Sequence, residues 1–298
     1  MSATTKTATQ IMSKPSHAKI TPRRSSDRGH SNHGWLNSYH TFSFAPHHDP
    51  TFQQFGSLRV LNEDRVAPSS GFPTHPHRDA EIFSYILSGE LTHRDSTVKP
   101  KDARGLGDVS KDDFYRMKRG DVQFTTGGTG IAHSEQNEHA GEEVHFLQIW
   151  ALPWKRGLPP TYHTSTFPEE SKRNGFVTII SPLRAGPKAT GQEEKDAVPV
   201  TEGTIPIHAD FLMGASIIAR GASASWTVGG EKAVVSESGR KVYLHLPMRR
   251  IGARIRVDGE TVLEEGDGAF VEKVNAGDEL LVESIGEGEA EVVVLDSN

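Results

Sequence analysis

The sequence predicts an all-β protein built from two related β-barrels that pack together. The chain has 298 residues, which at roughly 100 to 200 residues per domain corresponds to about two domains. Short strand-like runs alternate with Gly or Asp turns, and helical periodicity is scarce. The halves also resemble each other, because Arg119-Gly120-Asp121 precedes one expected strand and Glu265-Gly266-Asp267 precedes another.

The expected strands form two series. The first comprises residues 57–62, 81–87, 89–96, 121–126 and 143–152, and the second comprises residues 176–181, 223–229, 241–247, 253–259, 268–274, 278–284 and 290–296. Residues 181–200 are rich in Pro, Gly and charge and are interpreted as the connecting segment. Residues 97–118, heavily charged between two strands, predict a long surface loop.

These features divide the chain into three parts. We expect a flexible basic extension over residues 1–27, a first barrel domain over 28–170 and a second over 171–298. Six Lys or Arg residues but a single acid occur in residues 1–30. A disordered tail is the favoured interpretation of this segment, and a transit peptide is the alternative.

Composition excludes several classes of protein. The chain has no Cys, so disulfides, thiolate metal sites and cysteine nucleophiles are excluded, and any metal must be held by N and O ligands. A net charge of −6 without a basic face disfavours direct nucleic-acid binding. The sequence also lacks an apolar run long enough to predict a membrane span. We expect a monomer in the cytoplasm or nucleus, with the mitochondrion as the alternative that the acid-free N-terminus leaves open.

The histidines place the chemistry in the first half, because 13 of the 15 lie within residues 1–163. His75 and His77 are two residues apart, so on an extended strand both point from one face. His133 and Glu135 repeat this spacing. Two such pairs on facing strands would make a cup of four ligands. The alternative for an isolated pair is that both are ordinary polar residues of the surface. Glu81 competes with Glu135 as the carboxylate ligand.

Three neutral imidazoles and one carboxylate suit a transition ion such as iron, manganese, nickel, copper or zinc better than calcium or magnesium.

Several further residues each have two interpretations. His33 and His93 would orient a ligand or contact substrate, or be structural histidines, and Gln148 with Trp150 would line the cavity or fill it. We expect rim or surface positions for His139, His145 and His163, and core positions for the aromatic residues Trp35 and Phe42.

Motifs of other enzyme classes are missing. The sequence has no G-x-S-x-G elbow, no Walker loop and no dinucleotide fingerprint. The glycines of residues 127–130 precede an expected strand, not a helix, which disfavours a phosphate-binding loop. Hydrolase and NAD chemistry therefore lose support.

Two groups of residues resemble the cupin motifs. The first is Gly71, His75, His77, Glu81 and Gly89, and the second is Gly120, Asp121, Gly130 and His133. In most cupins the residue at the position of Glu81 would be a ligand. More specifically, GHSNHGWLNSYHTFSFA, GFPTHPHRDAEIFSYILSGELTHRDS and GDVQFTTGGTGIAHSE resemble the pirin family, including its bacterial quercetinase-like members. The resemblance covers roughly residues 28–167 and extends weakly into the second half.

This resemblance implies a bicupin, two double-stranded β-helix (jelly-roll) barrels, with non-haem Fe²⁺ in the first barrel and Mn, Ni, Cu, Co or Zn as alternatives. The family's ligands fall on His75, His77, His133 and Glu135, which leaves Glu81 as a supporting residue. The second barrel offers no paired histidines, so we expect it to be structural and free of metal. Loop 97–118 and the basic extension depart from the family pattern.

The implied activity is that of quercetin 2,3-dioxygenase, acting with O₂ on a flavonol or a similar enol or catechol. Glu135 would be the catalytic base, because a carboxylate is the ligand able to accept the substrate proton. The alternative is an iron-binding, redox-sensitive transcriptional co-regulator that binds protein partners such as transcription factors. A third interpretation is a non-catalytic bicupin with zinc or no metal.

Overall fold

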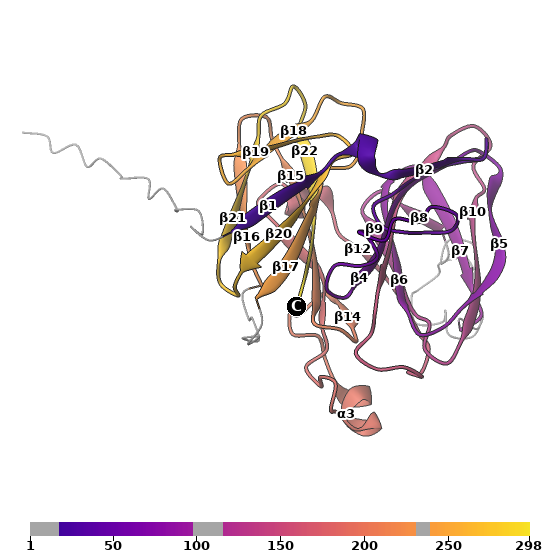
Figure 1. Ribbon diagram of the computed structural model, residues 1–298. Helices are drawn as coiled ribbons and strands as arrows, with labels where there is room; N and C mark the ends of the chain where they lie inside the picture. The colour runs from indigo at the N-terminus through magenta and orange to yellow at the C-terminus, as the bar shows by residue number, and fades with distance from the viewer. Residues whose placement is uncertain (1–17, 98–115, 231–238) are drawn as a thin grey trace, which may run out of the picture.

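The computed structural model describes residues 18–97, 116–230 and 239–298, and it confirms the predicted all-β architecture. Two β-barrel domains lie side by side, with the first half of the chain in one and most of the second half in the other (Figure 1). Among the described residues, turns and loops connect the strands, together with the small helices η1 (Ser25–Asp27), α2 (Glu169–Lys172) and α3 (Gly191–Asp196). In the described part of the chain, no helix is long and apolar enough to cross a membrane.

The first barrel consists of a seven-stranded and a four-stranded sheet, both antiparallel. The larger sheet has the order β12 (Thr161–Thr166), β9 (Asp121–Thr126), β6 (Glu81–Ser88), β11 (Val144–Ala151), β4 (Leu58–Val66), β3 (Leu36–His40) and β2 (Gly29–Asn32). The smaller sheet has the order β5 (Ser70–His77), β10 (Ile131–Asn137), β7 (Glu90–Asp95) and β8 (Arg116–Lys118).

The second barrel repeats this strand order, except that its edge strand β14 pairs in parallel with β13. Its larger sheet has the order β1 (Lys19–Arg23), β20 (Gly268–Val274), β17 (Arg240–His245), β22 (Ala290–Ser297), β15 (Phe211–Ile218), β13 (Val177–Pro182) and β14 (Ile205–Ile207). Its smaller sheet has the order β16 (Ser223–Thr227), β21 (Glu279–Ser284), β18 (Arg254–Val257) and β19 (Thr261–Glu264).

The predicted internal repeat is confirmed at its turns. Gly120 and Gly266 precede the equivalent strands β9 and β20 and have φ values of 86° and 88°. This left-handed conformation favours glycine, which explains why both halves keep one there.

The N-terminal segment differs from the expected extension. Residues 1–17 lie outside the described residues, but residues 19–23 form β1, which pairs with β20 from Lys19 opposite Glu272 to Arg23 opposite Gly268. β1 thus holds the sheet position in the second barrel that β12 holds in the first. The predicted loop 97–118 also differs at its end, because β8 pairs with β7; residues 98–115 lie outside the described residues.

Three apolar clusters form the cores. The two larger sheets face each other across the largest cluster, where Phe83 of the first barrel packs edge to face on Phe211 of the second at 5.9 Å. The predicted core residue Phe42 belongs to this cluster. The second barrel is filled by aliphatic side chains. The first barrel's cluster is smaller, with Trp35 packed partly buried against it.

The first barrel also buries many polar side chains, among them Asn62, Asp64, Ser84, His93, Gln123, His133, Glu135 and Gln148. Burying polar groups costs free energy unless they are paired. A polar interior in one barrel and an aliphatic interior in the other therefore place the candidate site in the first barrel.

Candidate metal centre

Three of the predicted ligands converge on one point inside the first barrel. His75 and His77 lie on β5, and His133 lies directly opposite His75 on β10. The Nε2 atoms of His75 and His133 are 3.0 Å apart, and one ring nitrogen from each of the three histidines lies within 4.8 Å of the others. Strand pairing thus produces the convergence that the i, i+2 spacing predicts.

Hydrogen bonds orient two of these rings. His75 Nδ1 lies 2.8 Å from the Pro73 carbonyl oxygen, so Nδ1 carries the proton and donates it. His133 Nδ1 lies 2.8 Å from Nε2 of the buried His93. If His133 donates to His93, both facing Nε2 atoms are unprotonated, and two lone pairs 3.0 Å apart favour a cation between them. The residues therefore fit a bound transition ion.

Burial keeps the rings of His77, His133 and His93 neutral. Burial, assisted by the neighbouring imidazoles, lowers the pKa of His77 to about 4 and that of His133 to about 2. The same causes lower the pKa of His93 to about 3. The neutral imidazole is the form that binds metals, so protons compete weakly at neutral pH.

Glu135 lines the same cavity but is held away from the three rings. A β-bulge between His133 and Glu135 shifts the register, so that Glu135 pairs with Phe72. Gln148 Nε2 donates to both carboxylate oxygens at 3.0 Å, and Ser84 Oγ donates to one at 3.2 Å. Burial raises the pKa of Glu135, and its carboxylate is not part of the 4.8 Å cluster.

A cavity of about 470 Å³ is lined by His75, His77 and Glu135. Gln148 and Trp150 line it, and His33 contributes to its outer part. Its walls include the aromatic side chains of Trp35, Phe44, Phe72 and Trp150, with an edge-to-face contact between Trp35 and Phe72 at 5.1 Å. Such a cavity suits a flat aromatic molecule with a polar group directed at the histidines.

Asp64 is a cavity residue that the sequence analysis missed. It is 3% exposed and accepts a hydrogen bond from Ser38, and burial raises its pKa to about 7. The signal was present in the polar run Asn62-Glu63-Asp64 at the centre of a mostly buried strand, because buried charged residues require a partner or a function.

Two expectations require correction. Glu81 does not support the histidine cluster. Its side chain bonds to Thr126 Oγ1 at 2.8 Å and to Nδ1 of His208, from the second barrel, at 2.9 Å. His145 is buried rather than at the rim, with Nε2 2.8 Å from Glu63. His139 is exposed as expected, and His163 is half-buried.

Two packed jelly-roll barrels, one with a histidine cluster in its interior, define a bicupin. The family model for pirin matches residues 21–151. A Pseudomonas aeruginosa protein called “Putative quercetin 2,3-dioxygenase” is 39% identical over 223 residues, which are 74% of this chain and 80% of that protein. This chain therefore belongs to the pirin family.

Two further comparisons concern Escherichia coli proteins. The quercetin 2,3-dioxygenase of strain K12 is 42% identical over 160 residues, or 54% of this chain and 62% of that protein, so the match spans less than two thirds of its length. The crystal structure of the bacterial pirin YhhW in complex with nickel(II) has a TM-score of 0.71 and 27% identity, and the match covers 94% of this chain and 99% of YhhW.

Proposed function

We propose that this protein is a metal-dependent dioxygenase that acts with O₂ on a flavonol or a similar aromatic enol or catechol. The observation that carries the proposal is a cavity lined by His75, His77 and the buried carboxylate of Glu135, with His133 converging on the same point as the other two imidazoles. The relatives named for quercetin 2,3-dioxygenase activity support the same chemistry.

His75, His77 and His133 would hold the ion, with Glu135 as a fourth ligand after a small movement. We propose Fe²⁺, with Mn, Co, Ni, Cu or Zn as alternatives, and the nickel(II) complex of YhhW supports a divalent transition ion in this family. The bound ion supplies Lewis acidity, which lowers the pKa of a hydroxyl group placed against it.

The protein's own residues would perform the remaining tasks. Glu135 accepts the proton of the substrate hydroxyl, because its raised pKa increases its proton affinity near neutral pH. Gln148 and Ser84 hold the carboxylate in position for this transfer. Trp35 and Phe72 contact the ring system and exclude water.

Oxygen uptake with quercetin tests the proposal, using protein reconstituted separately with each of the six ions. We expect uptake that depends on the metal. Glu135→Gln should lower kcat by about 100-fold or more while the metal is retained. Glu138→Gln is the matched control, since this carboxylate lies three residues further on and bonds Thr92 and Arg94 outside the cavity. Metal-loaded protein that consumes no oxygen in any form would refute the proposal.

The co-regulator alternative depended on the charged loop 97–118 and the basic extension 1–27. Residues 98–115 and 1–17 lie outside the described residues. The dioxygenase function is favoured over this alternative because the cavity residues that support it all lie in the described part of the chain.

A further inference from the structure

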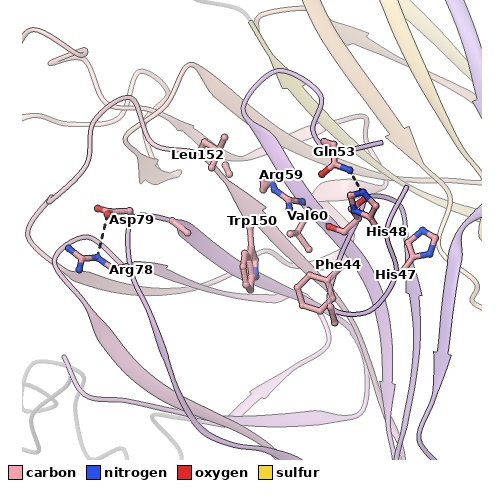
Figure 2. Close-up of a pocket in the computed structure, with 14 residues that line it drawn as sticks. Phe44, His47, His48, Gln53, Arg59, Val60, Arg78, Asp79, Trp150 and Leu152 are labelled. Atoms are coloured by element: carbon pink, nitrogen blue, oxygen red, sulfur yellow. Dashed lines mark hydrogen bonds and ion pairs between the residues drawn. The ribbon is translucent and has the colours of Figure 1, made fainter. Parts of the chain in front are cut away.

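A second cavity, of about 530 Å³, adjoins the one that contains the histidines (Figure 2). Both cavities are lined by Phe44, Ala45 and Trp150. The rings of Phe44 and Trp150 pack edge to face at 5.6 Å, and His77 contacts Trp150 at 4.9 Å. One aromatic pair therefore separates the second cavity from a predicted metal ligand, and the exposed Ala45 forms a shared rim.

The second cavity carries a guanidinium without a carboxylate partner. Arg59 Nη1 donates to the Ser43 carbonyl oxygen at 2.9 Å, and within the described ranges no carboxylate lies within ion-pair distance of Arg59. Arg78, at the other side of Trp150 in Figure 2, is paired with Asp79 at 3.4 Å. Asp49, the carboxylate that follows His48, pairs with Arg23 at 3.8 Å. Of the two arginines that line this cavity, Arg59 is therefore the one without a carboxylate partner among the described residues.

Other polar side chains line the same cavity. Figure 2 shows His48 and Gln53 beside Arg59, with His47 further away beyond His48. The amide nitrogen of Gln53 already donates to Ser43 Oγ and to the Asp49 carbonyl oxygen. His47 Nε2 is buried without a hydrogen-bond partner among the described residues, so a donor or acceptor is left free. Gly29 allows this placement, because a Cβ at Gly29 would lie 2.4 Å from the His47 ring.

The same cavity is also lined by an exposed apolar side chain and by two residues with an unfavourable backbone conformation. Leu152 is 38% exposed, one of few large apolar side chains on the described surface, and it lines the cavity beside Trp150. Ala45 and Asp79, on two of the walls, have φ values of 49° and 54°. Non-glycine residues in the left-handed region cluster at ligand sites, where surrounding structure holds them.

We propose that the second cavity binds the carboxylate of an aromatic substrate whose enol or catechol end lies in the metal cavity. Arg59 is the anion-binding residue, and the ligand extends over Ala45 from one cavity to the other. This inference rests on the proposed function and narrows its substrate class to acidic aromatic compounds. A carboxylate would pair with Arg59 in a charge-assisted hydrogen bond and so supply the ion pair that no described residue gives this arginine.

Calorimetric binding to the anaerobic, metal-loaded protein tests the inference. The probes are 3-hydroxyflavone and its two derivatives with a carboxylate on the B ring or the A ring. We expect one derivative to bind at least tenfold more tightly than the parent. Arg59→Gln should abolish this preference and leave the parent's affinity within twofold, and Arg59→Lys should retain part of it.

Arg78→Gln is the matched control, since this arginine lines the same cavity but has its own carboxylate, and the preference should persist. Should Arg59→Gln not fold, competition decides: benzoate should displace the acidic flavonol from the wild-type protein more readily than the parent. Equal affinities for all three flavonols, or a preference that survives in Arg59→Gln, would overturn the inference. Oxygen uptake with unsubstituted quercetin is scored separately, so failure of the dioxygenase proposal remains distinguishable.

Discussion

His93 Nε2 lies 2.8 Å from Nδ1 of His133, behind the predicted metal centre. His93 is completely buried on β7, and its own Nδ1 has no hydrogen-bond partner among the described residues. The contact holds the ring plane of His133, so that Nε2 faces the other two histidines. We propose that His93 is a positioning residue, although with Asp95 and His133 it also forms a second group of side chains able to hold an ion.

The first prediction concerns this contact. His93→Phe should weaken metal affinity by about 10- to 100-fold, because His133 loses the acceptor that orients it. His93→Gln should recover part of the affinity, since its amide oxygen can accept the same proton. Chelator competition measures both. His139→Ala, an exposed histidine, is the control; unchanged affinity in His93→Phe would contradict the positioning role.

The second prediction is that His75→Ala loses the bound transition metal but keeps the fold. β5 is a sheet edge that pairs with β10 alone, and its residues are exposed or half-buried. Removing one imidazole therefore costs little packing. Elemental analysis should show loss of metal, and urea unfolding should match that of metal-stripped wild-type protein. A variant that unfolds, or that keeps its full metal content, would show the expectation to be wrong.

The sequence predicted many barrel strands from their local apolar content, but it missed several others, among them β15, whose sequence FLMGASII is apolar. It also missed β1 and β8, whose sequences KITPR and RMK carry few apolar residues. Their strand state depends on hydrogen bonds to partners elsewhere, which for β1 lie about 250 residues away in β20. Propensity within a short window contains no information about such a partner.

The same limit applies to the candidate site: residue spacing is read from the local sequence, whereas the face on which a side chain lies depends on strand pairing. Two-residue spacing predicted the convergence of His75, His77 and His133, but Glu81 was expected near them because it follows His77 closely in the chain. On β6 the faces alternate, so Ser84 points to Glu135 while Glu81 shares its face with Tyr85, toward the second barrel. Only the register of the folded strands distinguishes these faces.

The third prediction uses the raised pKa of Asp64, about 7 against the usual 3.8. Folded protein keeps this proton between about pH 4 and 7, where the unfolded chain releases it. The proton on Asp64 therefore stabilises the folded protein fully below about pH 4, and this contribution is lost as pH rises through about 7. Asp64→Asn mimics the protonated acid, so its free energy of unfolding should rise relative to wild type by about 1.4 kcal/mol per pH unit across this range.

Urea unfolding of metal-free protein from pH 4 to 8 measures this difference. Titration of the histidines is common to both proteins and cancels, and the charged groups that act on Asp64 are Glu135, Arg28 and Glu63. Asp196→Asn, on the exposed face of α3, should run parallel to wild type. Parallel profiles for Asp64→Asn as well would show that Asp64 is ionised in the folded protein at neutral pH.

The last prediction concerns Glu63, which links the two barrels. Its oxygens contact Arg28 at 3.2 Å, His145 at 2.8 Å and, from the second barrel, His245 at 3.0 Å. Burial acts to raise the pKa of Glu63, but the bonds to His145 and His245 hold it well below its usual value. Glu63→Gln would leave the buried Arg28 charge without a carboxylate, which should cost about 3–5 kcal/mol of unfolding free energy.

Urea unfolding at pH 7 measures this loss. The control is Glu283→Gln, whose carboxylate forms a partly exposed pair with Arg256 at 3.6 Å and should change the free energy by less than about 1 kcal/mol. Because His245 joins Glu63 from the second barrel, the loss should lower the stability of both domains together and keep a single transition. A transition in which only the first barrel is destabilised would mean that this cluster does not couple the domains.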